Sequence, residues 1–249
     1  MNAPALIALA HGSRDPRAAR TVRQIVATTK SLRPDLKIEP AFLDHARPDV
    51  DSVVDRLAAR GHDEIVVVPL LLTEAYHARI DVPEVVARAA ERHDGLAIRV
   101  ADVVGTDAAL LTILDERLRE SLKESRVREL DALVLAAAGT SDALANATVA
   151  RLARLWGNRH RLPTSVAFAS TAPPSTGEAV RDWRRQGRRH VAVGSLFIAP
   201  GRLPDRAEEL ALEAGAVAVS RPLGAHAELS RILLARYSVG ALQLVKLPA

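Results

Sequence analysis

Residues 5–15 read ALIALAHGSRD, and residues 132–142 read ALVLAAAGTSD, so an apolar run and the turn that follows it occur twice in the chain. Later positions repeat as well, with shifts of 126 and then 119 residues. The matched positions are Ala41 with Ala167, Phe42 with Phe168, Pro48 with Pro174, Gly61 with Gly187, Gly105 with Gly224, Leu110 with Leu229 and Arg117 with Arg236. This internal repeat predicts two homologous domains, 1–125 and 130–249, joined by a charged segment.

Each half alternates apolar runs with amphipathic segments. The runs 5–10 and 64–72 are apolar without alternation, which is typical of strands buried on both faces of a parallel sheet. In the first half we expect strands at 5–10, 36–42, 64–72 and 96–104, and helices at 16–32, 48–60, 82–92 and 107–124. The predicted fold class is α/β, with two tandem four-stranded parallel sheets that carry helices on both faces. We expect the flavodoxin-like strand order 2-1-3-4 in each.

Composition excludes several classes of function. The 249 residues contain no cysteine, which excludes disulfide scaffolds, thiolate zinc sites, iron–sulfur clusters and cysteine nucleophiles. Aromatic residues make up 3%, too few for a platform that stacks nucleic-acid bases. The net charge of +4 (34 basic minus 30 acidic residues) fits an anionic small molecule. Every apolar stretch is shorter than a membrane span, so we expect a cytoplasmic protein with no membrane or nucleic-acid partner.

Three residues with metal-binding or proton-accepting side chains follow the first three predicted strands. They are His11, Asp44 and His77. In the predicted strand order these three loops are neighbours at the carboxyl edge of the sheet. Two imidazoles and one carboxylate suit a divalent first-row metal and accept protons near neutral pH. Taken singly, each residue also has a structural interpretation, as a helix cap, a turn residue or an exposed loop residue.

The second half provides an internal control for these three residues. Ala138, Ser170 and Leu203 stand at the matched positions, so all three polar groups are replaced while the repeated scaffold residues remain. Groups required by the fold would be expected in both halves. The pattern therefore predicts a functional site in the N-terminal half only.

Candidate anion-binding residues lie close to this set. Ser13, Arg14, Arg47 and Arg79 are each within three residues of a candidate, and the arginines can pair with carboxylates of a substrate. Arg202 and Arg206 are further candidates in the second half. The alternative for the arginines is ordinary solubilising surface charge.

Several segments of the chain resemble the class II chelatases, specifically the sirohydrochlorin cobaltochelatases and ferrochelatases in their two-domain form. The segments are LIALAHGSRDP (6–16), FLDHARP (42–48), VPLLLTEAYHARIDVPE (68–84), GSLFIAPGRLPDRAEE (194–209) and RPLGAHAELSRILLARY (221–237). Together they span nearly the whole chain.

The resemblance implies a lyase that inserts Co²⁺ or Fe²⁺, with Ni²⁺ as a further candidate, into sirohydrochlorin in cobalamin or sirohaem biosynthesis. It implies that His11 and His77 hold the metal or accept pyrrole protons, and that Asp44 assists where the family often has Glu. It also implies that the anionic tetrapyrrole lies in an interdomain cleft, and no tightly bound cofactor is expected besides the metal substrate.

Two other functions remain open from the residues alone. One is a non-catalytic carrier of metal or tetrapyrrole, and the other is a phosphate- or sugar-binding protein that uses residues 11–14 as an anion-binding turn. Only a chelatase accelerates metal incorporation. Because two fused halves can replace a homodimer, we expect a monomer. The physiological metal and the pathway stay open.

Overall fold

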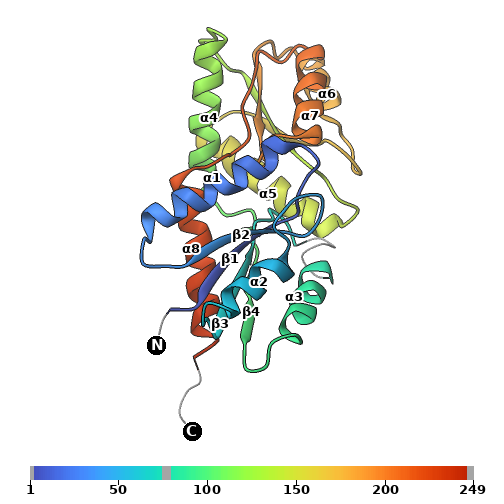
Figure 1. Ribbon diagram of the computed structural model, residues 1–249. Helices are drawn as coiled ribbons and strands as arrows, with labels where there is room; N and C mark the ends of the chain where they lie inside the picture. Colours follow the sequence, from blue (N-terminus) through green and yellow to red (C-terminus); the bar gives the residue numbers. More distant parts are fainter. Residues whose placement is uncertain (1–2, 75–79, 246–249) are drawn as a thin grey trace. The chain divides into compact units, whose positions relative to one another are not determined.

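The computed structural model describes residues 3–74 and 80–245 and divides into two compact units (Figure 1). The first unit is Met1–Gly105 with Ala225–Ala249, and the second unit is Thr106–Gly224. The first unit contains β1 (Ala5–Ala10), α1 (Pro16–Leu32), β2 (Ile38–Phe42), α2 (Val50–Ala58), β3 (Glu64–Pro69), α3 (Val82–Ala90), β4 (Ala97–Val100) and α8 (Ala227–Leu242). The second contains α4 (Leu110–Glu124), β5 (Ala132–Ala137), α5 (Ala143–His160), β6 (Thr164–Phe168), α6 (Thr176–Arg185), β7 (Val191–Ser195), α7 (Arg202–Glu213) and β8 (Ala218–Val219).

Each unit is built on a four-stranded parallel sheet. The strand orders are β2-β1-β3-β4 and β6-β5-β7-β8, and every described pairing is parallel. The predicted fold class and the predicted order 2-1-3-4 are therefore confirmed. In the first sheet, the carboxyl ends of β2, β1 and β3 are neighbours, so the loops that follow these three strands lie close together.

Helices cover both faces of the first sheet. Ile7 and Leu9 of β1 belong to one apolar core with Val53 and Leu57 of α2. The opposite face of the sheet packs on α8. Gly240 of α8 lies so close to Val66 of β3 that a Cβ added to this glycine would lie 2.8 Å from Cγ1 of Val66. α8 also packs along α1, as Figure 1 shows for the red and blue helices. All six residues of β1 are buried, as the unbroken apolar run predicts.

The last helix of each sequence half packs on the compact unit that holds the other half's sheet. α4 packs on β7 and β8, and α8 packs on α1 and β3. Two arginines at matched positions of the repeat fasten these helices: Arg117 donates to the carbonyl of Leu223 (3.2 Å), and Arg236 donates to the carbonyl of Val103 (3.0 Å). The compact units are thus divided differently from the repeated sequences, and the domains 1–125 and 130–249 stay a prediction about the repeat.

The observed elements are close to the predicted ones, with shorter strands. α1 has the predicted bounds, because Asp15 caps it and Pro16 occupies its first turn. β3 ends at Pro69 and β4 covers Ala97–Val100, so the apolar residues beyond them belong to loops, and Leu70, Val103 and Val104 among them are buried. Within residues 3–74 and 80–245, no helix has the length and apolarity needed to cross a membrane.

Candidate functional site

The carboxyl ends of β1 and β2 are joined by backbone hydrogen bonds that continue past the strands. The N–H of Leu43 donates to the carbonyl of Ala10 (3.0 Å), and the N–H of Asp44 donates to the carbonyl of His11 (2.9 Å). These bonds hold the backbones of His11 and Asp44 side by side. The structure therefore brings together two of the three predicted metal ligands.

Gly12 makes this approach possible. Its φ of +96° lies in the left-handed region, and a Cβ built on it would lie 1.7 Å from the carbonyl oxygen of Asp44. No side chain fits in that space, so the residue between the candidate histidine and the turn has to be glycine.

Asp44 is exposed, and its carboxylate is held by the residue that follows it. The backbone N–H of His45 donates to Oδ1 of Asp44 (2.7 Å), and Nε2 of the His45 ring lies 3.2 Å from Oδ2. His45 has a φ of +58°, which turns its ring back over the carboxylate. The side chain of Asp44 is 62% exposed and that of His45 is 38% exposed, so a metal ion has access to both.

His45 is the residue at this site that sequence reasoning did not select. Its position next to Asp44 was the available signal. Its left-handed backbone, which decides where the ring lies, has no signature in the sequence, because most histidines have negative φ.

The remaining predicted residues have mixed outcomes. His11 is half-buried, with its Nδ1 atom shielded from solvent. His77 and Arg79 lie outside the described residues, so the ligand set of His11, Asp44 and His77 stays a prediction. Within the described ranges, no three His, Asp or Glu side chains form a group that could hold a metal.

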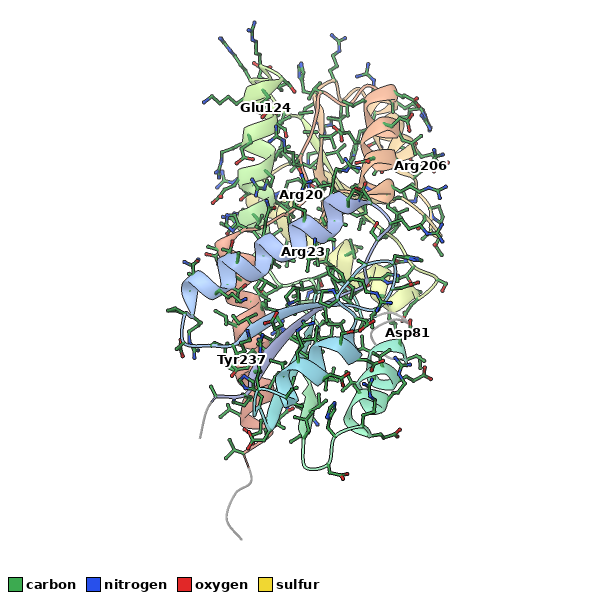
Figure 2. All side chains as sticks on the ribbon, in the orientation of Figure 1. Arg20, Arg23, Asp81, Glu124, Arg206 and Tyr237 are labelled. Atoms are coloured by element: carbon green, nitrogen blue, oxygen red, sulfur yellow. The ribbon has the colours of Figure 1, made fainter. Side chains whose placement is uncertain are left out.

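Two of the predicted substrate-binding residues have structural partners. Oγ of Ser13 accepts a hydrogen bond from the backbone N–H of Asp15 (3.1 Å), which shapes the entry into α1. Arg47 forms an ion pair with Asp49, and its carbonyl accepts a hydrogen bond from Nη2 of Arg23 (3.0 Å), a residue labelled on α1 in Figure 2.

Arg14 is exposed at the start of the same turn, and one residue later an ion pair steadies the beginning of α1. Asp15 caps the helix by accepting from the backbone N–H of Arg17 (2.8 Å), and it also accepts from Nη2 of the Arg17 guanidinium (2.6 Å). This side-chain hydrogen bond lowers the pKa of Asp15 below its usual value of 3.8. The cap is therefore ionised at neutral pH.

The second unit contains the same turn without the same chemistry. The N–H of Ser170 donates to the carbonyl of Ala138 (3.0 Å), as the N–H of Asp44 donates to that of His11. Gly139 has a φ of +83°, and a Cβ on it would lie 2.2 Å from the carbonyl oxygen of Ser170. Oγ of Ser170 donates to the carbonyl of Ala138 (3.0 Å), so this side chain completes the turn itself.

The matched turns agree with the result of a comparison with protein-family models. The CbiX model matches this chain twice, at residues 5–121 and 132–239. The chain belongs to the CbiX family. The two matched ranges begin at the first residues of β1 and β5, where the two repeated sheets begin.

Curated relatives of the chain are named as chelatases. The sirohydrochlorin cobaltochelatase of Priestia megaterium is 29% identical over 203 residues, which are 80% of this chain and 66% of that protein. The sirohydrochlorin ferrochelatase of the same organism is 26% identical over 237 residues, which are 92% of this chain and 87% of the relative.

A solved structure shares the fold. The sirohydrochlorin chelatase SirB from Bacillus subtilis subspecies spizizenii, in complex with cobalt, superimposes with a TM-score of 0.80 at 22% identity, over 97% of both chains. This likeness shows that the two-sheet architecture is that of a chelatase structure.

Proposed function

We propose that this protein inserts a divalent metal ion, Co²⁺ or Fe²⁺, into sirohydrochlorin, as the curated relatives are named for doing. One observation within the molecule supports the proposal most: a backbone hydrogen bond between the loops after β1 and β2 holds His11 beside Asp44, while the matched loops of the second unit have Ala138 and Ser170. Family membership supports it independently.

The metal is a substrate, so its ligands have to release it. An imidazole from His11, a carboxylate from Asp44 and a second imidazole from His77 form an incomplete coordination shell that leaves positions open for pyrrole nitrogens. Four thiolates would bind the metal too firmly for transfer, and the chain has none. As each pyrrole nitrogen replaces a protein ligand, the ion passes to the macrocycle.

Two pyrrole N–H protons have to leave during insertion. An unperturbed imidazole, with a pKa of about 6.5, accepts a proton near neutral pH. His45 is a candidate for this role, because its ring lies beside the carboxylate of Asp44, with Nε2 3.2 Å from Oδ2. When Asp44 binds metal, that carboxylate is shared between the ion and the ring.

Arginines near the turn provide positive charge for the carboxylates of the tetrapyrrole. Arg14 is exposed beside His11, whereas Arg47 is already paired with Asp49 and would have to exchange that partner. We therefore assign substrate binding to Arg14 ahead of Arg47, with Arg79 as the arginine nearest in sequence to His77. The expected position of the tetrapyrrole between the two repeated domains stays a prediction.

The test follows the absorbance change of sirohydrochlorin as it binds Co²⁺ or Fe²⁺ under anaerobic conditions. We expect purified protein to accelerate incorporation above the spontaneous rate, and the His11→Ala/His77→Ala variant to lose that acceleration. His190→Ala is the control. His190 directly precedes β7, so it lies at the amino end of a strand and not after a carboxyl end as His11 does, and its side chain is 45% exposed. A protein that binds metal and sirohydrochlorin without accelerating incorporation would be a carrier, and the proposal would be wrong.

A further inference from the structure

The first helix of the first unit is basic where it begins. The first eight residues of α1 include Arg17, Arg20 and Arg23, and all three side chains are exposed (Arg20 and Arg23 are labelled in Figure 2). Arg14, in the turn that precedes the helix, is exposed as well. The helix contains no acidic residue over its whole length. These four residues, called the α1 arginines below, therefore bring a concentration of positive charge next to the turn of His11.

The matched helix of the second unit has none of these charges. α5 follows a matched cap, since Asp142 corresponds to Asp15, and its first eight residues contain no arginine or lysine. The positions matched to the α1 arginines are occupied by Ser141, Leu144, Ala147 and Ala150. Leu144 is 74% exposed, so the second unit has an apolar side chain in solvent where the first has a guanidinium. The fold therefore does not require arginines at these positions.

The local structure leaves two of the α1 arginines uncompensated. They gather at the end of the helix where the helix dipole stabilises acidic side chains and not basic ones. Arg17 has an ion pair with Asp15 (2.6 Å). In the part of the chain that the structure describes, no carboxylate pairs with Arg14 or with Arg20. A bound anion would supply the negative charge that this region lacks.

Arg23 connects the helix to the loop that carries Asp44 and His45. Its Nη2 atom donates to the carbonyl of Arg47 (3.0 Å), three residues beyond Asp44. The α1 arginines thus begin at the turn after β1 and reach the loop after β2, the two segments that hold His11 and Asp44 side by side. Their charge lies next to the candidate metal site and within the same compact unit.

We propose that the α1 arginines bind the peripheral carboxylates of the tetrapyrrole substrate. Arg14 and Arg20 pair with the carboxylates, and Arg23 is a positioning residue for the loop of Asp44. This inference rests on the proposed function for the identity of the substrate. A guanidinium pairs with a carboxylate through two parallel hydrogen bonds. Because a helix rises about 1.5 Å per residue, Arg17 to Arg23 span about 9 Å, so different arginines reach different carboxylates of one macrocycle.

The test measures the binding of metal-free sirohydrochlorin to the full chain by the change in its fluorescence, separately from the rate of metal insertion. We expect Arg20→Gln to weaken binding about threefold, as for loss of one exposed ion pair, and Arg14→Gln/Arg20→Gln to weaken it about tenfold. Both losses should shrink as the salt concentration rises, because exposed charges are screened. Binding of Co²⁺ in the absence of sirohydrochlorin should not change.

The control is Arg151→Gln, which removes an exposed arginine from α5, the matched helix of the second unit. It should bind sirohydrochlorin as the wild type does. Arg20→Gln should also unfold at the same denaturant concentration as the wild type, because Arg20 has no partner in the described structure to lose. Weaker binding with unchanged stability distinguishes a substrate-binding arginine from a structural one.

Unchanged affinity in Arg14→Gln/Arg20→Gln would overturn the proposal. An equal loss in Arg151→Gln, or a loss that does not depend on salt, would overturn it as well. These outcomes are distinct from a failure of the proposed function. A protein that binds sirohydrochlorin through the α1 arginines without accelerating metal insertion would support this inference and contradict the chelatase activity.

Discussion

The turn after β1 and the turn after β5 have the same backbone and different chemistry. In both, a glycine with positive φ lies against a carbonyl of the neighbouring loop, and the same backbone hydrogen bond joins the two loops. The residue before the glycine is His11 in one unit and Ala138 in the other. Because alanine is sufficient for this turn, the imidazole of His11 is not required by the fold. Its presence has to be explained by function.

The loops after β2 and β6 also share a backbone and differ in their side chains. His45 and Thr171 both have left-handed backbones, with φ of +58° and +67°, and each is followed two residues later by a cis X-Pro bond. The matched positive φ values and the matched backbone hydrogen bonds show that the loop keeps its path in both units. The carboxylate and the ring that face each other in the first unit, from Asp44 and His45, are replaced by two hydroxyl groups in the second.

The largest change should come from replacing the glycine with positive φ that both turns contain. Gly12→Ala places a methyl group on the Asp44 carbonyl and forces alanine into the left-handed region, so we expect a loss of more than about 2 kcal/mol of unfolding free energy together with loss of metal insertion. Chemical denaturation and the absorbance assay measure the two effects.

Two other glycines calibrate this result. Gly139→Ala meets the matched carbonyl and should destabilise the protein to a similar extent, whereas Gly61→Ala has open space around its Cβ and should cost only about 1 kcal/mol for its positive φ. If Gly12→Ala behaved like Gly61→Ala, the close approach of the two loops would be incorrect.

His11→Ala tests the difference between the two turns directly. We expect metal insertion to slow by about 100-fold or more, as for loss of a group that holds or moves a reacting species, while the free energy of unfolding changes by less than about 0.5 kcal/mol. The comparison variant is Ala138→Gly in the second unit, which should leave the insertion rate unchanged. A large loss of stability in His11→Ala would mean that the imidazole is a structural residue.

The sequence predicts the scaffold well and the details of the site less well. The expected strand order rests on the flavodoxin-like arrangement of repeated βα units. The buried strand β1 and the bounds of α1 follow from local signals, namely an unbroken apolar run, an aspartate cap and a proline in the first helical turn. The exchange of α4 and α8 between the compact units does not, because an amphipathic helix packs equally well on either of two similar sheets.

The site shows the same limit. Its residues follow from their places after the strands, but the orientation of the His45 ring depends on a single φ angle, which local sequence does not determine.

His45→Asn sharpens the comparison within the site. Asparagine tolerates left-handed backbone, so the turn should persist while the ring that faces Asp44 is lost. We expect a decrease in the insertion rate of about threefold to tenfold and a changed dependence of that rate on pH, because one proton acceptor has been removed. Thr171→Asn, the same position of the matched turn, should alter neither. An unchanged pH profile in His45→Asn would remove the proposed proton-accepting role.

The smallest effect concerns the helix caps that follow the two turns. Asp15 and Asp142 are matched caps, but Arg17 stands beside the first and Leu144 beside the second. The hydrogen bond from Arg17 lowers the folded-state pKa of Asp15 below 3.8, so the folded protein binds fewer protons than the unfolded chain in that range. Stability from this pair is therefore present above pH 3.8 and is lost as the pH falls through the lowered pKa.

Asp15→Asn keeps a capping side chain and removes the charge, so its stability should approach that of the wild type below about pH 3, as seen by denaturation across pH. Asp142→Asn is the control, and since no arginine occupies the matched position, it should show a smaller change with pH than Asp15→Asn does.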